Sequence, residues 1–376
     1  MILSAKQLNR ATLGRQLLLQ REALEVTEGV YRVMALQAQE AASPYVALWN
    51  RLAHFQAADL DASFAASAVV KASLMRITLH VVHADDYPAV HGAMLASLRA
   101  SRLGDPRFTE SGLTTADLDA LLPHLVEFTA QPRTKVEIEG MLAAHLGFQH
   151  PGVWWALRTF APLWHAPTAW PWSFGFRPSF VTARPTLQAE RYAEAVQHLV
   201  RRYLEAFGPA SVQDVAQFTR LTRTVVRKAL DLLGDELRKR QGPDGSELYD
   251  LPDGWLPDED TPASPRLLPM WDSTLLAYQD RSRIIPPAYR RLVIRQNGDV
   301  LPTLLVDGYV AGVWRPVSGG IEATAFHPLS EATWAGLASE AEALVAFLAK
   351  RDPDVYRRYA HWWTSLPSAE VKRLPG

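Results

Sequence analysis

The chain has 376 residues, of which 48% are hydrophobic and 21% are charged, and its 39 basic and 40 acidic side chains give a formal net charge of −1. These values are typical of a globular protein with two or three domains. The absence of cysteine excludes disulfides, thiol catalysis and cysteine-ligated metal centres. Because the charge is balanced, a nucleic-acid-binding surface would need its basic residues concentrated on one face.

Membrane and targeting signals are missing from the sequence. No segment approaches the roughly 18 uninterrupted apolar residues of a membrane span. The N-terminus is charged and amphipathic, with no apolar signal-peptide core. We therefore expect a cytoplasmic protein without a membrane partner.

The N-terminal third reads as helices followed by a small hairpin. Apolar spacing and capping residues predict helices around Leu13–Leu19, from Thr27 (as N-cap) to about Leu36, from Ser43-Pro44 onward, and near 59–67. Alternation and β-branched residues predict strands at about 69–74 and 77–82. Helices followed by a hairpin are the element order of a winged helix.

Two glutamines, Gln37 and Gln39, fall where the second helix is expected to end, in "MALQAQ". They could be solvated amides at a helix end, or they could share a site. Residues two apart diverge by about 200° on a helix but point the same way in an extended segment. A shared role therefore requires the helix to end at or before Gln37.

The same element order recurs twice. In the second copy, "TKVEIEGMLAAHLG" and "HPGVWWALRTFAPLW" read as helices, and the Pro- and Trp-rich segment 165–185 reads as an irregular wing. In the third copy, Ser211 caps "VQDVAQFT" and Thr222 caps "RTVVRKALDLL", which gives a helix-turn-helix signal, with a wing strand in "LYDLPDGWL".

The character of the chain changes after the acidic, Pro-rich segment 256–266. Three strand-like runs follow, with turn signals at Asn297-Gly298 and Asp307-Gly308, and then a helix at 331–351. The predicted fold class is mostly α with small β-hairpins (α+β). The expected segments are 1–110, 111–186 and 187–256 for three helix-and-wing units, and 266–376 for a hairpin-rich and helical C-terminal part.

Basic residues gather in two places. The first set lies just before, on and after the helix 223–233 and could enter a DNA groove or form a solvated face: Arg220, Arg223, Arg227, Lys228, Arg238, Lys239 and Arg240. The second set could contact phosphates or could balance the acidic segment before it: Arg281, Arg283, Arg290, Arg291 and Arg295.

Other polar candidates have plainer interpretations. His80 and His83 are three apart on a strand and point to opposite faces, so we expect no metal site there, although one of them could line a polar site. Asp272 could be a base, a cap or a salt-bridge partner, and a helix cap is favoured. The sequence contains no Gly-rich phosphate loop, and the expected cofactor and metal content is none.

Four segments in chain order resemble the winged-helix DNA glycosylases of the AlkZ-like group: "LQAQEAASPYVALWNRL", "LMRITLHVVHADDY", "GPASVQDVAQFTRL" and "LPMWDSTLLAYQDRSRI…LVDGYVAGVWR". The resemblance implies three tandem winged-helix units in a C-shaped arrangement around a DNA-sized channel. It implies a monofunctional glycosylase for N7-alkylated guanine, including guanine in azinomycin-type interstrand crosslinks. It also implies a role in antibiotic self-resistance. The family's Gln-X-Gln motif corresponds to Gln37-Ala38-Gln39.

From this resemblance we expect Gln37 and Gln39 to be catalytic, because an amide can orient water and face a developing sugar cation. No catalytic lysine, and hence no strand cleavage, is expected. Residues expected to contact DNA are Arg76, His80, Arg281, Arg283, Arg290, Arg291 and Arg315, the last at the end of a hairpin over 299–315 that could probe a groove. The partner would be double-stranded DNA carrying alkylation damage or crosslinks, bound by a monomer in the bacterial nucleoid. The rival hypotheses are a non-enzymatic regulator that reads DNA through helix 223–233, and a damage-binding protein without chemistry.

Overall fold

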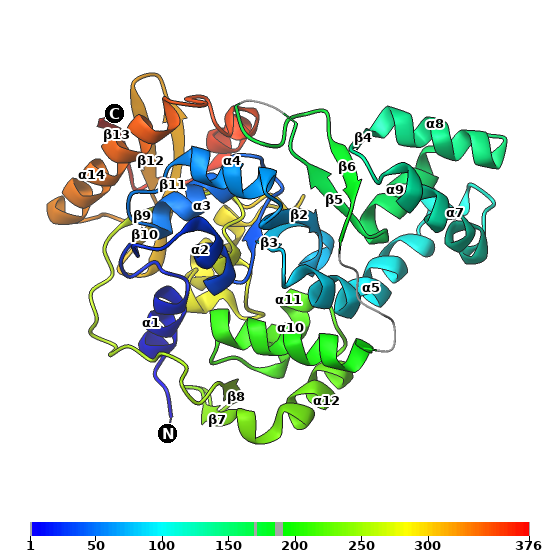
Figure 1. Ribbon diagram of the computed structural model, residues 1–376. Helices are drawn as coiled ribbons and strands as arrows, with labels where there is room; N and C mark the ends of the chain where they lie inside the picture. The colour runs from blue at the N-terminus through cyan, green and yellow to red at the C-terminus, as the bar shows by residue number, and fades with distance from the viewer. Residues whose placement is uncertain (1, 169–170, 185–190, 376) are drawn as a thin grey trace.

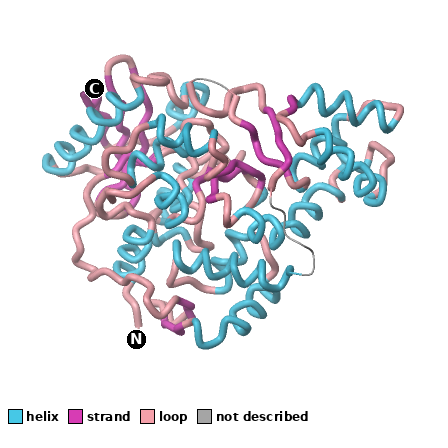
Figure 2. The backbone as a smooth tube through the Cα atoms, in the orientation of Figure 1, coloured by secondary structure: helices cyan, strands magenta, loops and turns pink. Residues whose placement is uncertain are grey.

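The computed structural model describes residues 2–168, 171–184 and 191–375. In these residues helices predominate, and the named strands form four separate sheets. Figures 1 and 2 show three groups of helices, each with a small sheet beside it, and a larger sheet near the C-terminus. In this part of the chain, no helix is both long and apolar enough to cross a membrane.

The N-terminal group contains α1 (Ala5–Arg15), α2 (Val26–Arg32), α3 (Ser43–Arg51) and α4 (Ala57–Ala65). Its sheet has the order β1-β3-β2, with β1 at Leu36–Gln37, β2 at Val69–Ser73 and β3 at Leu79–His83. The expected capping of the second helix is wrong: the residue before α2 is Glu25, and Thr27 lies inside the helix. The helix also ends at Arg32 rather than at Leu36, which leaves the glutamines outside it.

The second group contains α5 (Tyr87–Leu103), α6 (Pro106–Thr109), α7 (Thr115–Phe128), α8 (Lys135–Leu146) and α9 (Pro151–Phe160). Its sheet has the order β4-β6-β5, with β4 at Arg133–Thr134, β5 at Leu163–Ala166 and β6 at Ser179–Thr182. The α8 prediction is confirmed, because Thr134 forms a capping box with Glu137. The segment 165–185 is less irregular than expected, since β5 and β6 occupy parts of it; residues 169–170 and 185 lie outside the described residues.

The third group contains α10 (Tyr192–Phe207), α11 (Val212–Thr219) and α12 (Arg223–Leu233), with a two-stranded sheet of β7 (Arg238–Gln241) and β8 (Glu247–Asp250). The predicted helix, turn and helix are confirmed. Ser211 forms a capping box with Asp214, Arg220 ends α11 in the left-handed conformation, and Thr222 caps α12. These signals are local, so the sequence placed them within a residue.

A five-stranded antiparallel sheet dominates the C-terminal part, in the order β13-β12-β11-β10-β9. Its strands are β9 (Arg266–Leu268), β10 (Thr303–Val306), β11 (Tyr309–Val317), β12 (Gly320–Ala325) and β13 (Glu370–Pro375), accompanied by α13 (Arg290–Val293) and α14 (Glu331–Leu348). The short 3₁₀ helices are η1 (Met75–Ile77), η3 (Gly234–Glu236), η4 (Ser273–Leu275), η5 (Arg281–Arg283), η6 (Pro287–Tyr289) and η7 (Arg357–Ser365).

Two of the C-terminal expectations have different outcomes. The Asp307-Gly308 turn is confirmed, with both residues at positive φ between β10 and β11. The first strand-like run is wrong, because Arg290–Val293 forms a turn of helix and only an isolated bridge joins Ile294 to Val300. In this run the tertiary packing overrides the local β preference.

Two hydrophobic cores hold the molecule together. One joins the N-terminal helices and β3 to the C-terminal sheet and α14, and the other joins β2, α5, α9 and the helices α10, α11 and α12. In Figure 1 the blue N-terminal helices accordingly lie beside the orange strands, and the green α10–α12 group lies below them. The glutamine segment contributes to both cores, with Leu36 in the first and Ala35 in the second. It therefore sits where the two cores meet.

Candidate active site

The chain leaves the helix before the two glutamines and enters the sheet at Leu36–Gln37. After α2 ends at Arg32, Met34 takes a positive φ of 68° and redirects the backbone into β1. Strand β1 pairs antiparallel with β3, with Gln37 directly opposite His80, and the N–H of Ala38 donates to the carbonyl of Leu79. The helix therefore ends before Gln37, as a shared role of the two glutamines requires, and Gln39 follows the strand in a bend.

The two side-chain amides are held by backbone groups. The Oε1 atom of Gln37 accepts the N–H of Gln39 at 2.9 Å, and the Oε1 atom of Gln39 accepts the N–H of Leu79 at 3.2 Å. Gln37 is 4% exposed, whereas Gln39 is open to solvent. Each amide oxygen keeps a second lone pair, so both can still accept a hydrogen bond from water.

His80 is the cross-strand neighbour of this pair. Its ring is fully buried and lies edge-on to Phe218 of α11, with ring centroids 6.2 Å apart. Its Nδ1 atom is 3.1 Å from the carbonyl oxygen of Thr78. Burial, with the charge of Arg76 acting in the same direction, lowers the pKa of His80 to about 4. The imidazole is therefore neutral at physiological pH.

Arg76 occupies a strained hairpin turn next to this histidine. Arg76 and Ile77 join β2 to β3, and both have positive φ, 57° and 61°. Such a conformation is normally left to glycine or asparagine, and strain of this kind gathers at functional sites. The Nε atom of Arg76 is buried and has no hydrogen-bond partner among the described residues.

Four arginines from separate elements form a cluster around this turn: Arg76, Arg220, Arg281 and Arg290. Burial lowers the pKa of Arg281 to about 10, and the charges of Arg76 and Arg290 act in the same direction. Burial and Arg220 likewise lower the pKa of Arg76. None of the ion pairs between described residues involves these four side chains. A cluster of unneutralised cations is suited to phosphate groups.

The other predicted DNA contacts have partners or positions of their own. Arg283 stacks on the ring of Tyr278 at 4.0 Å and donates to the carbonyl of Pro209, and Arg315 pairs with Glu322 on the adjacent strand β12. Arg291 is exposed on α13. The structure does not join these three to the cluster.

The hairpin over 299–315 is not free to probe a groove. Trp314 is fully buried, and its Nε1–H donates to the carbonyl of Leu268 at 2.9 Å. At the tip, Arg10 of α1 forms an ion pair with Asp307, and Asn9 donates to the carbonyl of Gly308. The tip is thus packed onto α1, which corrects the expectation of an open hairpin.

The preference for Asp272 as a cap is confirmed, and the residue also has a partner that the sequence did not reveal. Its carboxylate caps η4 through the N–H of Thr274 and forms two hydrogen bonds of 2.9 Å with Arg51. Both partners are buried. The adjacent Ser273 donates to the carbonyl of Ala35, two residues before Gln37, so this buried pair supports the segment that carries the motif.

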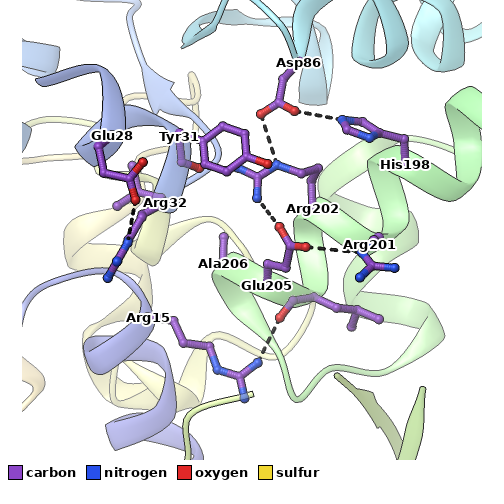
Figure 3. A network of polar contacts seen from close by, with 12 residues as sticks. Arg15, Glu28, Tyr31, Arg32, Asp86, His198, Arg201, Arg202, Glu205 and Ala206 are labelled. Carbon is purple, nitrogen blue, oxygen red and sulfur yellow. Dashed lines mark hydrogen bonds and ion pairs between the residues drawn. The ribbon is translucent and has the colours of Figure 1, made fainter. Parts of the chain in front are cut away.

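A second polar network fixes the end of α2 (Figure 3). Arg202 of α10 is 3% exposed; it pairs with Asp86 and Glu205, donates to the carbonyl of Tyr31 and covers the ring of Tyr31. His198 bonds the other oxygen of Asp86 at 2.8 Å. Sequence reasoning missed this network because Tyr31 and Asp86 lie more than 100 residues from their partners on α10.

The basic face of α12 remains open to both interpretations. Arg223, Arg227 and Lys228 are exposed, as either a DNA-reading helix or a solvated face requires. In the described parts of the chain, no group of three histidine or carboxylate side chains could hold a metal ion.

Comparisons with known proteins agree with this architecture. A family model described as DNA glycosylase AlkZ-like matches residues 30–347. An interstrand DNA cross-link repair glycosylase of Streptomyces sahachiroi is 29% identical over 141 residues, which cover 35% of this chain and 37% of that protein. The solved structure of the S. sahachiroi DNA glycosylase AlkZ matches with a TM-score of 0.79 at 22% identity, over 94% of this chain and 99% of that chain. The latter likeness shows a shared fold.

Proposed function

The chain belongs to the AlkZ-like DNA glycosylase family, and from this premise we propose that it hydrolyses the N-glycosidic bond of N7-alkylated guanine in double-stranded DNA. The substrates include bulky adducts and interstrand crosslinks of the azinomycin type. Released base and an intact abasic strand are the products. The enzyme acts as a monomer, with no cofactor.

The chemistry of the substrate suits amides. Alkylation at N7 makes guanine cationic, so the base leaves as a neutral molecule and needs little protonation. The transition state resembles an oxocarbenium ion at C1′, as in glycoside hydrolysis. An amide oxygen orients water and faces the developing cation with its dipole. Ordinary purines, which need acid assistance, are spared.

The single observation that carries the proposal is the pair of amides on one short segment beside β3. Gln37 and Gln39 lie outside any helix, and backbone N–H groups fix both side chains at 2.9 and 3.2 Å. Such fixed amides need little reorganisation during reaction. The neighbouring cations of Arg76, Arg281 and Arg290 would hold phosphates of the bound strand. Arg283, Arg291 and Arg315 remain candidates for contacts farther along the duplex.

The test is excision from duplex oligonucleotides that carry N7-methylguanine, followed by alkaline cleavage at abasic sites. We expect Gln37→Ala and Gln39→Ala each to slow single-turnover excision by about 10²-fold. Gln149→Ala, an exposed glutamine on the loop before α9, is the matched control and should keep the wild-type rate. Full activity in both motif variants would remove the proposed mechanism.

A regulatory function is the second candidate, because α12 carries exposed basic side chains on a capped helix-turn-helix. A regulator would bind one preferred operator and release no base. A damage-binding protein would select lesion DNA without cleaving the glycosidic bond. Wild-type protein that binds N7-methylguanine duplex but leaves the base in place would favour the latter.

A further inference from the structure

The proposed hydrolysis releases a proton that the two amides cannot accept. A cationic N7-alkylguanine nucleotide and water give a neutral base, a neutral abasic sugar and one proton. Amide side chains donate and accept hydrogen bonds but do not take up protons near neutral pH. A glutamine pair therefore orients the attacking water and leaves its proton without an acceptor. This inference rests on the proposed function.

His80 is placed to fill this gap. It is the antiparallel partner of Gln37 in the β1–β3 pair, so the two side chains lie on one face of the sheet with Cβ atoms about 5 Å apart. The Gln39 amide is anchored on the backbone N–H of Leu79, the residue that precedes His80 in the chain. Gln37 is thus the cross-strand neighbour of His80, and the Gln39 amide is held one residue away from it along β3.

The hydrogen bond at Nδ1 determines the tautomer. The carbonyl oxygen of Thr78 can only accept, so Nδ1 of His80 carries the hydrogen and Nε2 carries a lone pair. The Nε2 atom is buried and has no hydrogen-bond partner among the described residues. A buried acceptor left unsatisfied in the free protein is a costly arrangement that calls for an explanation.

We propose that His80 is the proton acceptor of the hydrolysis, taking the proton of the attacking water at Nε2 either directly or through one bridging water. The C1′–N9 bond breaks, and its electron pair moves to the guanine, which becomes neutral. The water oxygen forms the new bond to C1′. The proton goes to Nε2, and the imidazolium then releases it to solvent.

The surroundings of His80 keep it available for this task. The charged group that faces it is a cation, Arg76 on η1, which itself lies near Arg220 at the end of α11 and Arg281 on η5. Arg76 opposes protonation of the ring before the reaction, so the lone pair stays free. A weak base is sufficient, because water that has attacked an oxocarbenium ion is a strong acid.

Other bases near the motif are already occupied. The carboxylate of Glu40, next to Gln39, is bound by Arg358 and by the Tyr359 hydroxyl at 2.9 Å. Asp272 is buried in its pair with Arg51. His83 lies at the far end of β3 against Tyr31, 5.5 Å between ring centroids. Of these groups, only His80 has a buried free lone pair on the face of Gln37.

Chemical rescue is the decisive experiment, since a purely structural imidazole would not depend on the lone pair. His80→Ala is assayed in single turnover on the N7-methylguanine duplex, alone and with added imidazole or pyrrole. The two rings have the same shape and can fill the cavity, but pyrrole lacks the acceptor nitrogen. We expect a loss of about 10²-fold, recovery with imidazole and no recovery with pyrrole. Equal recovery with both rings would overturn the proposal.

His91→Ala is the matched control, because it removes another buried imidazole, bonded to the carbonyl of Phe160 on α9. It should keep the wild-type excision rate in the folded protein. If His80→Ala does not fold, His80→Gln replaces it; that side chain retains an acceptor oxygen but takes up no proton. If His80→Gln binds the lesion as the wild type does but excises it about 10²-fold more slowly, the result supports the proposal. Excision by this variant at the wild-type rate overturns it. Wild-type protein without activity would instead defeat the proposed function itself.

Discussion

Lys71 is a buried cation without a carboxylate partner, and its removal gives a direct test of the packing between β2 and β5. The side chain is 5% exposed, and its Nζ lies 4.7 Å from the ring centroid of Phe174. Burial lowers the pKa of Lys71 to about 7 from the ordinary 10.5. No ion pair between described residues includes it. We therefore predict that Lys71→Met changes how the free energy of unfolding depends on pH.

The sign follows from proton binding. Above pH 7 the folded protein loses the Lys71 proton while the unfolded chain keeps it, so the unfolded state binds more protons and stability rises with pH. Each pH unit contributes up to about 1.4 kcal/mol in this window. Between pH 7 and pH 9 the wild type should gain roughly 2 kcal/mol that Lys71→Met does not gain.

The measurement is urea unfolding of both proteins at several pH values between 7 and 9, taking the difference between their unfolding free energies. His165 lies near Lys71, but its pKa is lowered well below 6.5 by burial and by the charges of Lys71 and Arg158, so it does not titrate in this window. Lys350→Met, which removes an exposed lysine, is the control and should follow the wild-type curve. A difference between wild type and Lys71→Met that is constant with pH would refute the reasoning.

Three further predictions concern stability and DNA binding. Asp272→Asn leaves Arg51 buried without its counter-ion and should cost about 3–5 kcal/mol of unfolding free energy. Gly312→Ala would place a Cβ 2.2 Å from the carbonyl oxygen of Thr324 and should cost about 1–3 kcal/mol, which a fall in Tm reports. Arg281→Ala should reduce the slope of log K against log salt by about 1 on undamaged duplex DNA, as expected for one lost phosphate contact; an unchanged slope would exclude this contact.

The sequence predicted the locally determined elements well. The helices α8, α11 and α12 begin at capping residues whose partners are at most three positions away. The five-stranded sheet was only partly foreseen, because β9 and β13 lie far from their partners in the sequence. Strand β13 has no turn signal that connects it to β12. Pairing of this kind depends on the whole core, which no local pattern encodes.

The candidate site divides in the same way. That the helix must end at or before Gln37 could be stated in advance as a condition, since the Ser43-Pro44 signal predicts a new helix nearby. The pairing of Gln37 with His80 could not, because it depends on the register of β1 against β3. Arg220 entered the cluster only because α11 packs against η1. The spacing of residues in the sequence does not predict that contact.

The charges around the motif explain why amides and arginines can work together. A cationic base and an oxocarbenium-like sugar would be repelled by Arg76, Arg220 and Arg281 if these charges stood alone. Under the proposed function, bound phosphates would neutralise them, so the site would become tolerant of positive charge only when DNA occupies it. The arginines would then contribute to binding, and the amides and His80 to the chemical step. Loss of Arg281 should accordingly weaken the affinity for DNA while leaving the excision rate at saturating DNA nearly unchanged. Loss of His80 should slow excision while leaving the affinity nearly unchanged.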